Sequence, residues 1–297
     1  DAELNGDDTP LGRSKLAAAF GRADVIVPTV SDVIDAEIIG HAGPNLKLLA
    51  NFGVGVNHID LDAARAKGIA VTNTPDVLTE DTADLAMALI LMAARRLGEG
   101  ERMLRGGGWT GWAPTQHLGR RVNGAKLGII GMGRIGAALG RRARGFGMRV
   151  HYHNRGPVEA GLAAELAATY WDDLDAMIGA VDILSVNCPL SPETHHLLSA
   201  ERLALLQPHA FVVNASRGGI IDEAALADAL KSGAIAGAGL DVFEGEPAVH
   251  ASLLGLENVV LLPHLGSATL DGRIDMGMRA MANVEAFLAG ETPPDLL

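Results

Sequence analysis

The chain has 297 residues, 48% of them hydrophobic, which is typical of a globular protein with a sizeable buried core and excludes a disordered chain. Its net charge of -12 argues against nucleic acid or an anionic membrane surface as the main partner, although a locally basic pocket is compatible with it. The one cysteine, Cys188, excludes an internal disulfide and favours a reducing cytoplasm as the location.

Strands and helices are predicted to alternate from the start of the chain. The predicted strands are residues 23–28, 46–51 and 69–73, and the helices between them are 35–42 and 60–68. A longer helix is predicted at residues 79–96, with acidic residues early and arginines late, as the helix dipole favours. Its apolar run, residues 84–94, is too short to cross a bilayer, so we expect no membrane segment.

After a loop rich in glycine and tryptophan, residues 105–116, the alternation continues. The predicted strands are residues 126–131, 149–154, 182–189, 210–216, 237–243 and 258–263. Continuous apolar strands that alternate with helices predict a parallel sheet covered on both faces, an α/β fold. The last predicted helix, residues 271–289, has no strand after it, so another part of the protein must accept it.

The segment "GMGRIG" has the form of a dinucleotide-binding turn, because an apolar strand precedes it and a helix and a further strand follow it. Gly131 permits the tight turn, Gly133 lets the backbone approach a pyrophosphate, and Gly136 lets the helix pack close to the sheet. The helix N-terminus, with Arg134, is expected beside the phosphates. The alternative is a glycine turn without a ligand.

The end of the next strand indicates which cofactor is preferred. An NAD site usually has an Asp or Glu about 20 residues after the turn, which binds the ribose hydroxyls and repels a 2′-phosphate. This chain has Asn154 and Arg155 there. Arg155 can form a charge-assisted bond to a phosphate, so we predict NADP(H). In the alternative, Arg155 is solvated and NAD(H) binds.

Three polar stretches follow apolar strands and supply an arginine, a glutamate and a histidine. They are residues 214–222 with Arg217, 241–247 with Glu246, and 263–269 with His264. Because ligands bind at the carboxyl ends of the strands in a doubly wound sheet, we expect all three near the cofactor. A guanidinium can hold a carboxylate at two points, and an imidazole oriented by a carboxylate can transfer a proton. Jointly they predict hydride transfer to or from an anionic substrate, although each alone has an ordinary structural explanation.

Motifs along nearly the whole chain resemble the D-isomer-specific 2-hydroxyacid dehydrogenase family. They are "NFGVGVNHIDL" (51–61), "VTNTPDVLTEDTADLA" (71–86), "GIIGMGRIG" (128–136), "CPLSPETHHLL" (188–198), "NASRGGIIDEAAL" (214–226), "AGLDVFEGEP" (238–247) and "PHLGSAT" (263–269). The resemblance implies two doubly wound parallel-sheet domains. A Rossmann-type nucleotide domain, residues 77–267, would be inserted into a flavodoxin-like substrate domain formed by residues 1–76, with its first strand before Asp1, and by the C-terminal helix, residues 268–297.

The resemblance also implies residue roles. Arg217 binds the substrate carboxylate with the backbone amides of Val54 and Gly55, His264 is the acid/base, and Glu246 is its partner. The implied cofactor contacts are Gly131, Gly133, Arg134, Ile135, Gly136, Asn154, Arg155, Cys188, Pro189, Thr194, Ala215, Ser216, Asp241, Gly266 and Thr82. Asp241 could instead cap a turn, Cys188 could be a buried inert thiol, and Thr82 could serve the first turn of its helix. No metal ligand is assigned.

Further residues favour one branch of the family. Glu246 stands where formate dehydrogenases have Gln, and Asn51 stands where phosphoglycerate dehydrogenases tend to have Arg. The loop 107–114 resembles that of glyoxylate/hydroxypyruvate reductases, which implies a homodimer contact in which Trp112 closes over a small substrate; alternatively Trp109 and Trp112 only pack the interface. We therefore expect a reductase of glyoxylate or hydroxypyruvate, with a phosphoglycerate-type dehydrogenase or a dinucleotide-sensing corepressor as alternatives.

Overall fold

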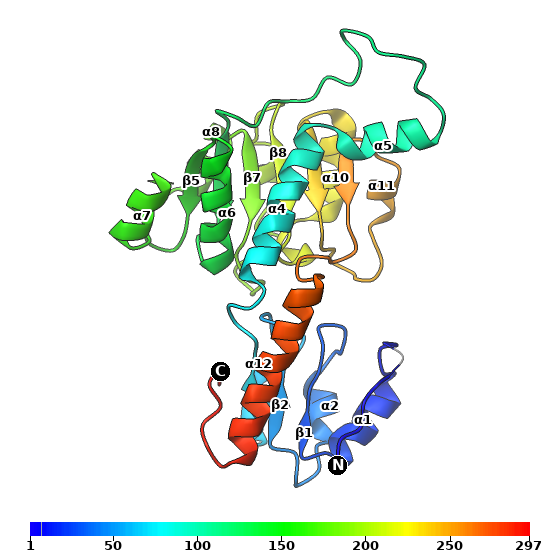
Figure 1. Cartoon of the computed structure of the whole chain (residues 1–297), viewed down its shortest axis with the longest axis vertical. Helices are drawn as coiled ribbons and strands as arrows, with labels where there is room; N and C mark the ends of the chain where they lie inside the picture. Colours follow the sequence, from blue (N-terminus) through cyan, green and yellow to red (C-terminus); the bar gives the residue numbers. More distant parts are fainter. Residues whose placement is uncertain (7) are drawn as a thin grey trace. The chain divides into compact units, whose positions relative to one another are not determined.

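The protein consists of two compact units. The computed structural model describes residues 1–6 and 8–297 (Figure 1). The small unit comprises residues 1–78 and 269–297, and the large unit comprises residues 79–268. In the part of the chain that is described, no helix is both long and apolar enough to cross a membrane.

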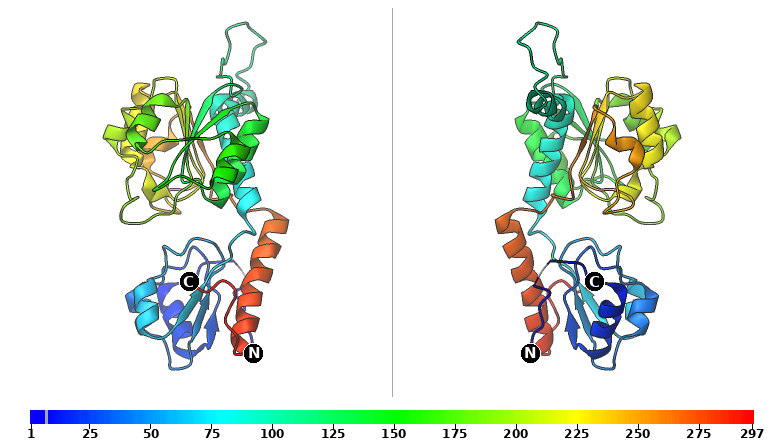
Figure 2. Two further views of the ribbon diagram at one scale, coloured as in Figure 1. Left: turned by 90° about the vertical axis from the view of Figure 1, so that its left-hand side faces the viewer. Right: turned by 90° about the vertical axis from the view of Figure 1, so that its right-hand side faces the viewer.

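The small unit is a parallel sheet between two helical layers (Figure 2). Its described elements are α1 (Arg13–Arg22), β1 (Val25–Ile26), α2 (Ala36–Gly40), β2 (Leu48–Ala50), α3 (Leu61–Ala66), β3 (Ala70–Thr72) and α12 (Leu270–Leu288). Phe20, Ile38 and Ala64 from α1, α2 and α3 pack with Leu49 of β2 in one buried core. Helix α12 covers β2 on the other face, so the helix without a following strand has its partner in this sheet.

The C-terminal residues are fastened to α12 and to the sheet. Both oxygens of the buried Asp295 carboxylate accept hydrogen bonds from Arg279 at 2.6 Å, and Asn283 donates a third at 2.9 Å. Burial alone would raise the pKa of Asp295, but the bonds from Arg279 and Asn283 hold it below its usual value. Leu297 then donates its amide to the carbonyl of Val71, at 2.9 Å. The chain end is thus part of the packed small unit.

The large unit, of which every residue is described, contains a seven-stranded parallel sheet in the order β10-β9-β8-β7-β4-β5-β6. Its strands are β4 (Lys126–Ile130), β5 (Arg149–His153), β6 (Thr169–Tyr170), β7 (Ile183–Val186), β8 (Phe211–Asn214), β9 (Gly237–Leu240) and β10 (Val259–Leu261). The strand order reverses between β4 and β7, and this is the place where doubly wound sheets bind ligands. The α/β class predicted from the sequence is confirmed.

Helices cover both faces of this sheet. They are α4 (Thr79–Ala94), α5 (Leu97–Arg105), α6 (Arg134–Gly145), α7 (Ala160–Leu166), α8 (Leu174–Ala180), α9 (Ala200–Leu203), α10 (Glu223–Ser232) and α11 (Ala251–Leu254), with a 3-10 turn, η1 (Gly218–Ile220). Helices α4 and α6 share one core with Ile129 and Tyr152, and α8 and α10 share another with Leu184 and Val212. The central strands β4, β7, β8 and β9 are therefore buried on both sides, which explains their largely apolar sequences, whereas the edge strand β6 is partly exposed.

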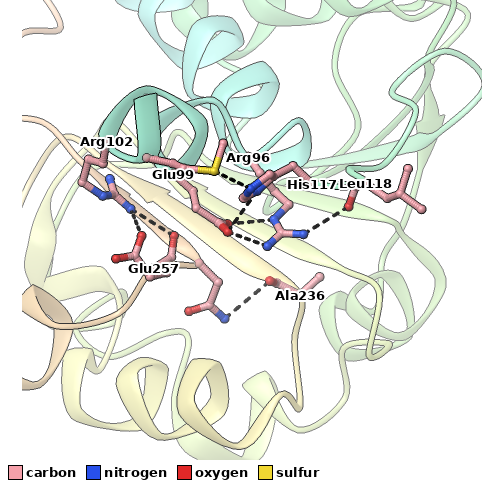
Figure 3. A network of polar contacts seen from close by, with 9 residues as sticks. Arg96, Glu99, Arg102, His117, Leu118, Ala236 and Glu257 are labelled. Atoms are coloured by element: carbon pink, nitrogen blue, oxygen red, sulfur yellow. Dashed lines mark hydrogen bonds and ion pairs between the residues drawn. The ribbon is translucent and has the colours of Figure 1, made fainter. Parts of the chain in front are cut away.

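The long helix predicted at residues 79–96 is shorter than expected. Helix α4 ends at Ala94, Arg96 has a left-handed backbone with a φ of 55°, and α5 begins at Leu97. The side chain of Arg96 binds Glu99 at 2.6 Å, and His117 lies 3.3 Å from the same carboxylate. Figure 3 shows how these three side chains meet. These contacts stabilise the break between the helices and hold the end of the following loop. A cavity of about 380 Å³ adjoins them.

Candidate active site

The glycine turn follows β4 and is shaped by close backbone approaches. Gly131 has a φ of 96°, and a Cβ atom there would lie 2.6 Å from the amide nitrogen of Cys188. A Cβ at Gly136 would lie 2.3 Å from the carbonyl oxygen of Gly131. By contrast, no described atom lies within 4 Å of a Cβ placed on Gly133, the residue before α6. The turn therefore offers open backbone at the N-terminus of a 12-residue helix, which suits a pyrophosphate.

The end of β5 is tied to this turn by a side chain. Asn154 Oδ1 accepts a hydrogen bond from the amide of Met132, in the middle of the turn, at 2.7 Å. Arg155 is exposed and interacts electrostatically with Glu193. The Ser191 hydroxyl and, in smaller part, the charge of Arg155 hold the pKa of Glu193 below its usual value. Arg155 thus lies close to the loop that follows β7.

That loop contains Cys188, Pro189 and Thr194. Thr194 Oγ1 donates to the carbonyl of Pro189 at 2.7 Å and accepts from the amide of Ser191 at 2.7 Å, so it closes the loop on itself. Burial raises the pKa of the Cys188 thiol to about 11, which makes it an unreactive thiol at neutral pH. Ser216 donates its hydroxyl to the carbonyl of Cys188 and joins this loop to the one after β8.

Arg217 lies on a tight turn after β8. The buried Asn214 side chain spans this turn, because Nδ2 donates to the carbonyl of Arg217 at 2.9 Å and Oδ1 accepts from the amide of Ser216 at 3.0 Å. A Cβ at Gly218 would lie only 1.9 Å from the backbone carbon of Phe243. Glycine at this position lets the turn contact the segment after β9 directly. Burial lowers the pKa of Arg217, and the charge of Glu246 opposes that shift.

His264 and Glu246 form a hydrogen-bonded pair. Nδ1 of His264 lies 2.8 Å from Glu246 Oε2, and Glu246 Oε1 accepts from the amide of Phe243 at 2.9 Å. Burial alone would raise the pKa of Glu246, but these two bonds and the charges of His264 and Arg217 hold it below its usual value. An ionised carboxylate on Nδ1 leaves Nε2 of the ring for proton transfer. The three strand-end residues predicted to meet are therefore brought together.

Asp241 supports the turn that carries His264. Its fully buried carboxylate accepts hydrogen bonds from the amides of Leu265, at 2.7 Å, and Gly266, at 2.8 Å. Burial raises its pKa although both amides oppose the shift. Thr82 of α4 donates to the carbonyl of Gly266 at 3.1 Å. Asp241 and Thr82 thus both hold the His264 turn.

Val54 and Gly55 lie in the small unit, in a loop held by polar side chains for which the sequence predicted no structural role. The fully buried Asn51 donates to the carbonyls of Gly53, at 2.9 Å, and Gly55, at 3.2 Å. His58 Nε2 lies 3.0 Å from Asn51 Oδ1. Asn73 donates to the carbonyl of Val54 at 2.9 Å. The available signal was an asparagine at the carboxyl end of an apolar strand, and Asn214 has the same position in β8.

Trp112 is not part of this cluster within the single chain. It belongs to the loop after α5, and Figure 1 shows this loop at the end of the large unit opposite the carboxyl ends of the strands. Its side chain is 82% exposed. Of the other predicted cofactor residues, Ile135 lies in the first turn of α6 and Ala215 directly follows β8.

Comparison with known proteins identifies the family. The model of the D-isomer specific 2-hydroxyacid dehydrogenase NAD binding domain matches residues 87–266, most of the large unit. The chain belongs to this family. It is therefore an oxidoreductase that binds a nicotinamide dinucleotide, and the open glycine turn beside the strand-end cluster fits such a ligand.

Several relatives cover the whole chain. A glyoxylate reductase of Thermococcus onnurineus is 44% identical over 304 residues, which cover 100% of this chain and 89% of the relative. A crystal structure of the NADPH-dependent glyoxylate/hydroxypyruvate reductase of Sinorhizobium meliloti, in complex with NADP and malonate, is 39% identical. It has a TM-score of 0.87 over 96% of this chain and 87% of that one. A glyoxylate reductase from Paecilomyes thermophila is 33% identical with a TM-score of 0.88, over 96% of this chain and 88% of that one.

Proposed function

We propose that this enzyme reduces glyoxylate or hydroxypyruvate to the D-2-hydroxy acid with NADPH. The observation that carries the proposal is the His264–Glu246 pair, 2.8 Å apart, beside Arg217 at the carboxyl ends of three neighbouring strands. The relatives named above as glyoxylate reductases match the chain from end to end and support the choice of substrate.

The site residues differ in their proposed roles, which are substrate binding, proton transfer and orientation of the histidine ring. Arg217 and the backbone amides of Val54 and Gly55 bind the substrate carboxylate. When bound, the nicotinamide supplies the hydride. His264 gives the proton from Nε2 to the carbonyl oxygen, because Glu246 occupies Nδ1 and fixes the orientation of the ring. The pKa of Glu246 lies below its usual value, so the carboxylate that orients the ring is ionised at neutral pH.

The preference for NADPH rests on the end of β5. The side-chain carbonyl of Asn154 accepts a hydrogen bond from the amide of Met132, so its NH₂ group is left for a ligand. Asn154 also bears no charge that would repel a 2′-phosphate. Arg155 supplies the positive charge for that phosphate. Glu193, which interacts with Arg155, limits the preference, because its own charge opposes a phosphate in the same place.

A homodimer through α5 and the following loop is part of the proposal. The exposed large apolar side chains of this region are Leu97, Leu104, Trp109, Trp112 and Leu118. A cluster of exposed apolar side chains on one segment is typical of a protein interface. We assign Trp112 to the substrate site of the neighbouring subunit.

The test is the initial rate of glyoxylate and hydroxypyruvate reduction with NADPH and, separately, NADH. We expect turnover with NADPH, and a loss of about 10²- to 10⁴-fold in His264→Ala with unchanged NADPH binding. His250→Ala, another histidine of the large unit, is the matched control. Near-normal turnover in His264→Ala would contradict the acid role, and turnover with NADH alone would contradict the cofactor assignment. Nucleotide binding without reduction of any 2-oxo acid would favour the corepressor alternative.

A further inference from the structure

Two adjacent histidines point the same way at the end of the loop after β7. The rings of His195 and His196 stack with their centroids 4.0 Å apart and 23° between their planes. Neighbouring side chains in an extended segment point to opposite sides. Here the chain turns, and His196 has a left-handed backbone with a φ of 47°, which brings both rings to one side.

A carboxylate from another loop meets both rings. Glu244 Oε1, after β9, lies 2.9 Å from His196 Nε2 and 3.5 Å from His195 Nε2. The three potential ligand atoms all lie within 4.8 Å of one another. The side chains of His195, His196 and Glu244 are 52%, 35% and 41% exposed, so a hydrated ion can reach them.

The backbone under these side chains is held firmly. His196 donates its amide to the carbonyl of Gly219 at 2.8 Å, and Leu198 donates to Ile220 at 3.0 Å. The amide of Glu244 donates to the buried carboxylate of Glu223 at 2.7 Å. Both loops are thus anchored on the segment 218–223, which fixes the backbone that carries the three side chains.

We propose that His195, His196 and Glu244 form a binding site for one divalent transition-metal ion of the Zn²⁺ type. Two imidazole nitrogens and one carboxylate oxygen are a ligand set that such ions prefer. Bonds of about 2.0–2.2 Å in a tetrahedral arrangement require ligand atoms roughly 3.3–3.5 Å apart. The observed 2.9 and 3.5 Å to Glu244 need only a small adjustment to reach that spacing.

The ion would bridge the loop after β7 and the loop after β9. The second loop also carries Glu246, the partner of His264, but Glu244 itself has no part in the reaction assigned above. Water would complete the coordination of the ion, and the bound ion would stabilise this edge of the large unit. It is independent of the substrate that the enzyme reduces.

The test is titration of untagged, chelator-treated protein with Zn²⁺ by calorimetry. We expect one ion per chain, and at least about tenfold weaker binding in His195→Gln, His196→Gln and Glu244→Gln. Because an ion that binds only the folded state raises its stability, Zn²⁺ should also raise the Tm of the wild type and not of Glu244→Gln. The Glu244→Gln change keeps the backbone bond to Glu223, and its Tm without metal checks the fold.

Two control variants separate this site from other histidines. His209 forms a two-member pair with Asp182 at 2.7 Å, so His209→Gln should bind Zn²⁺ like the wild type. His264→Gln should also retain the ion, which distinguishes the new site from binding at the catalytic pair. No binding at millimolar Zn²⁺, or binding that persists in Glu244→Gln and His196→Gln, would overturn the proposal.

Discussion

The amide of Met132 donates a hydrogen bond to the side-chain carbonyl of Asn154 across 2.7 Å, joining the glycine turn to the end of the next strand. The two residues lie 22 positions apart in the sequence. The bond fixes which atoms of Asn154 are left for a ligand, and Arg155, the next residue, is exposed beside Glu193. Cofactor choice can therefore be tested at these two positions.

Arg155→Ala should raise the KM for NADPH by about 10- to 100-fold and leave the KM for NADH nearly unchanged, because only the phosphate contact is lost. Asn154→Asp should reduce the use of NADPH further, since its charge repels a 2′-phosphate while it can still accept from Met132. Steady-state kinetics with both cofactors measure this, with the exposed Arg144→Ala as control. Equal effects on both cofactors would contradict the assignment.

Glu246→Gln should lower kcat and leave NADPH binding unchanged, because the carboxylate that orients the His264 ring is replaced by an amide. The pKa of Glu246 lies below its usual value, so the carboxylate is ionised throughout the neutral range and loses its charge only as the pH falls through that lowered value. The advantage of the wild type over the variant should therefore be constant across the neutral range and shrink in acid. The pH profiles of kcat for both proteins measure this; equal kcat values at neutral pH would argue against the pairing.

Gly218→Ala should disturb the site through the backbone alone. The added Cβ would lie 1.9 Å from the backbone of Phe243, so the Arg217 turn must move away from the segment that carries Glu246. We expect a loss of about 1–3 kcal/mol in the free energy of unfolding, together with a fall in kcat/KM. Gly161→Ala lies in α7, where the added Cβ would meet no atom within 4 Å, so it should be slightly stabilising in denaturation and neutral in kinetics.

Asn51→Ala should weaken substrate binding more than cofactor binding. The variant loses the bonds to the carbonyls of Gly53 and Gly55, which hold the loop whose amides we assign to the substrate carboxylate. The KM for glyoxylate should rise by on the order of tenfold while the Kd for NADPH stays the same. The exposed Asn57→Ala is the control. A change in NADPH affinity of the same size would instead indicate general damage.

Asp295→Asn should destabilise the protein by about 1–3 kcal/mol at neutral pH, because the buried charged bond to Arg279 is lost. The pKa of Asp295 is lowered in the folded state, so its contribution is present above about pH 4, the value for an unperturbed Asp. It is lost as the pH falls through the lower folded value. Denaturation at pH 7 and at pH 3 should show the difference between variant and wild type shrinking in acid. The exposed Asp62→Asn should show no such trend.

The site at the strand ends could be located from the sequence because its parts obey local rules. Apolar runs between helices predict parallel strands, and parallel strands place their carboxyl ends at one edge of the sheet, so Arg217, Glu246 and His264 had to lie near one another. The glycine turn is local in part: Gly136 is required by its contact with the carbonyl of Gly131, and Gly131 by its own φ of 96°, whereas the close approach of Gly131 to Cys188 comes from the loop after the neighbouring strand β7.

Short strands and interrupted helices were harder to predict from the sequence. The two-residue strand β6 has too little sequence to show a pattern, and the predicted long helix gave no sign of the break at Arg96. That break depends on Glu99 and His117, which lie on either side of the loop.

The sequence by itself thus determined the fold class, the glycine turn and the strand ends at which Arg217, Glu246 and His264 lie, because periodicity and strand-end position are properties of neighbouring residues. Only the tertiary structure decided which polar groups satisfy one another. Asp241 binds amides 24 and 25 residues away, and Glu244 meets His196 across 48 residues. Such partners depend on how loops from different strands pack at the sheet edge, and no spacing along the chain encodes that distance.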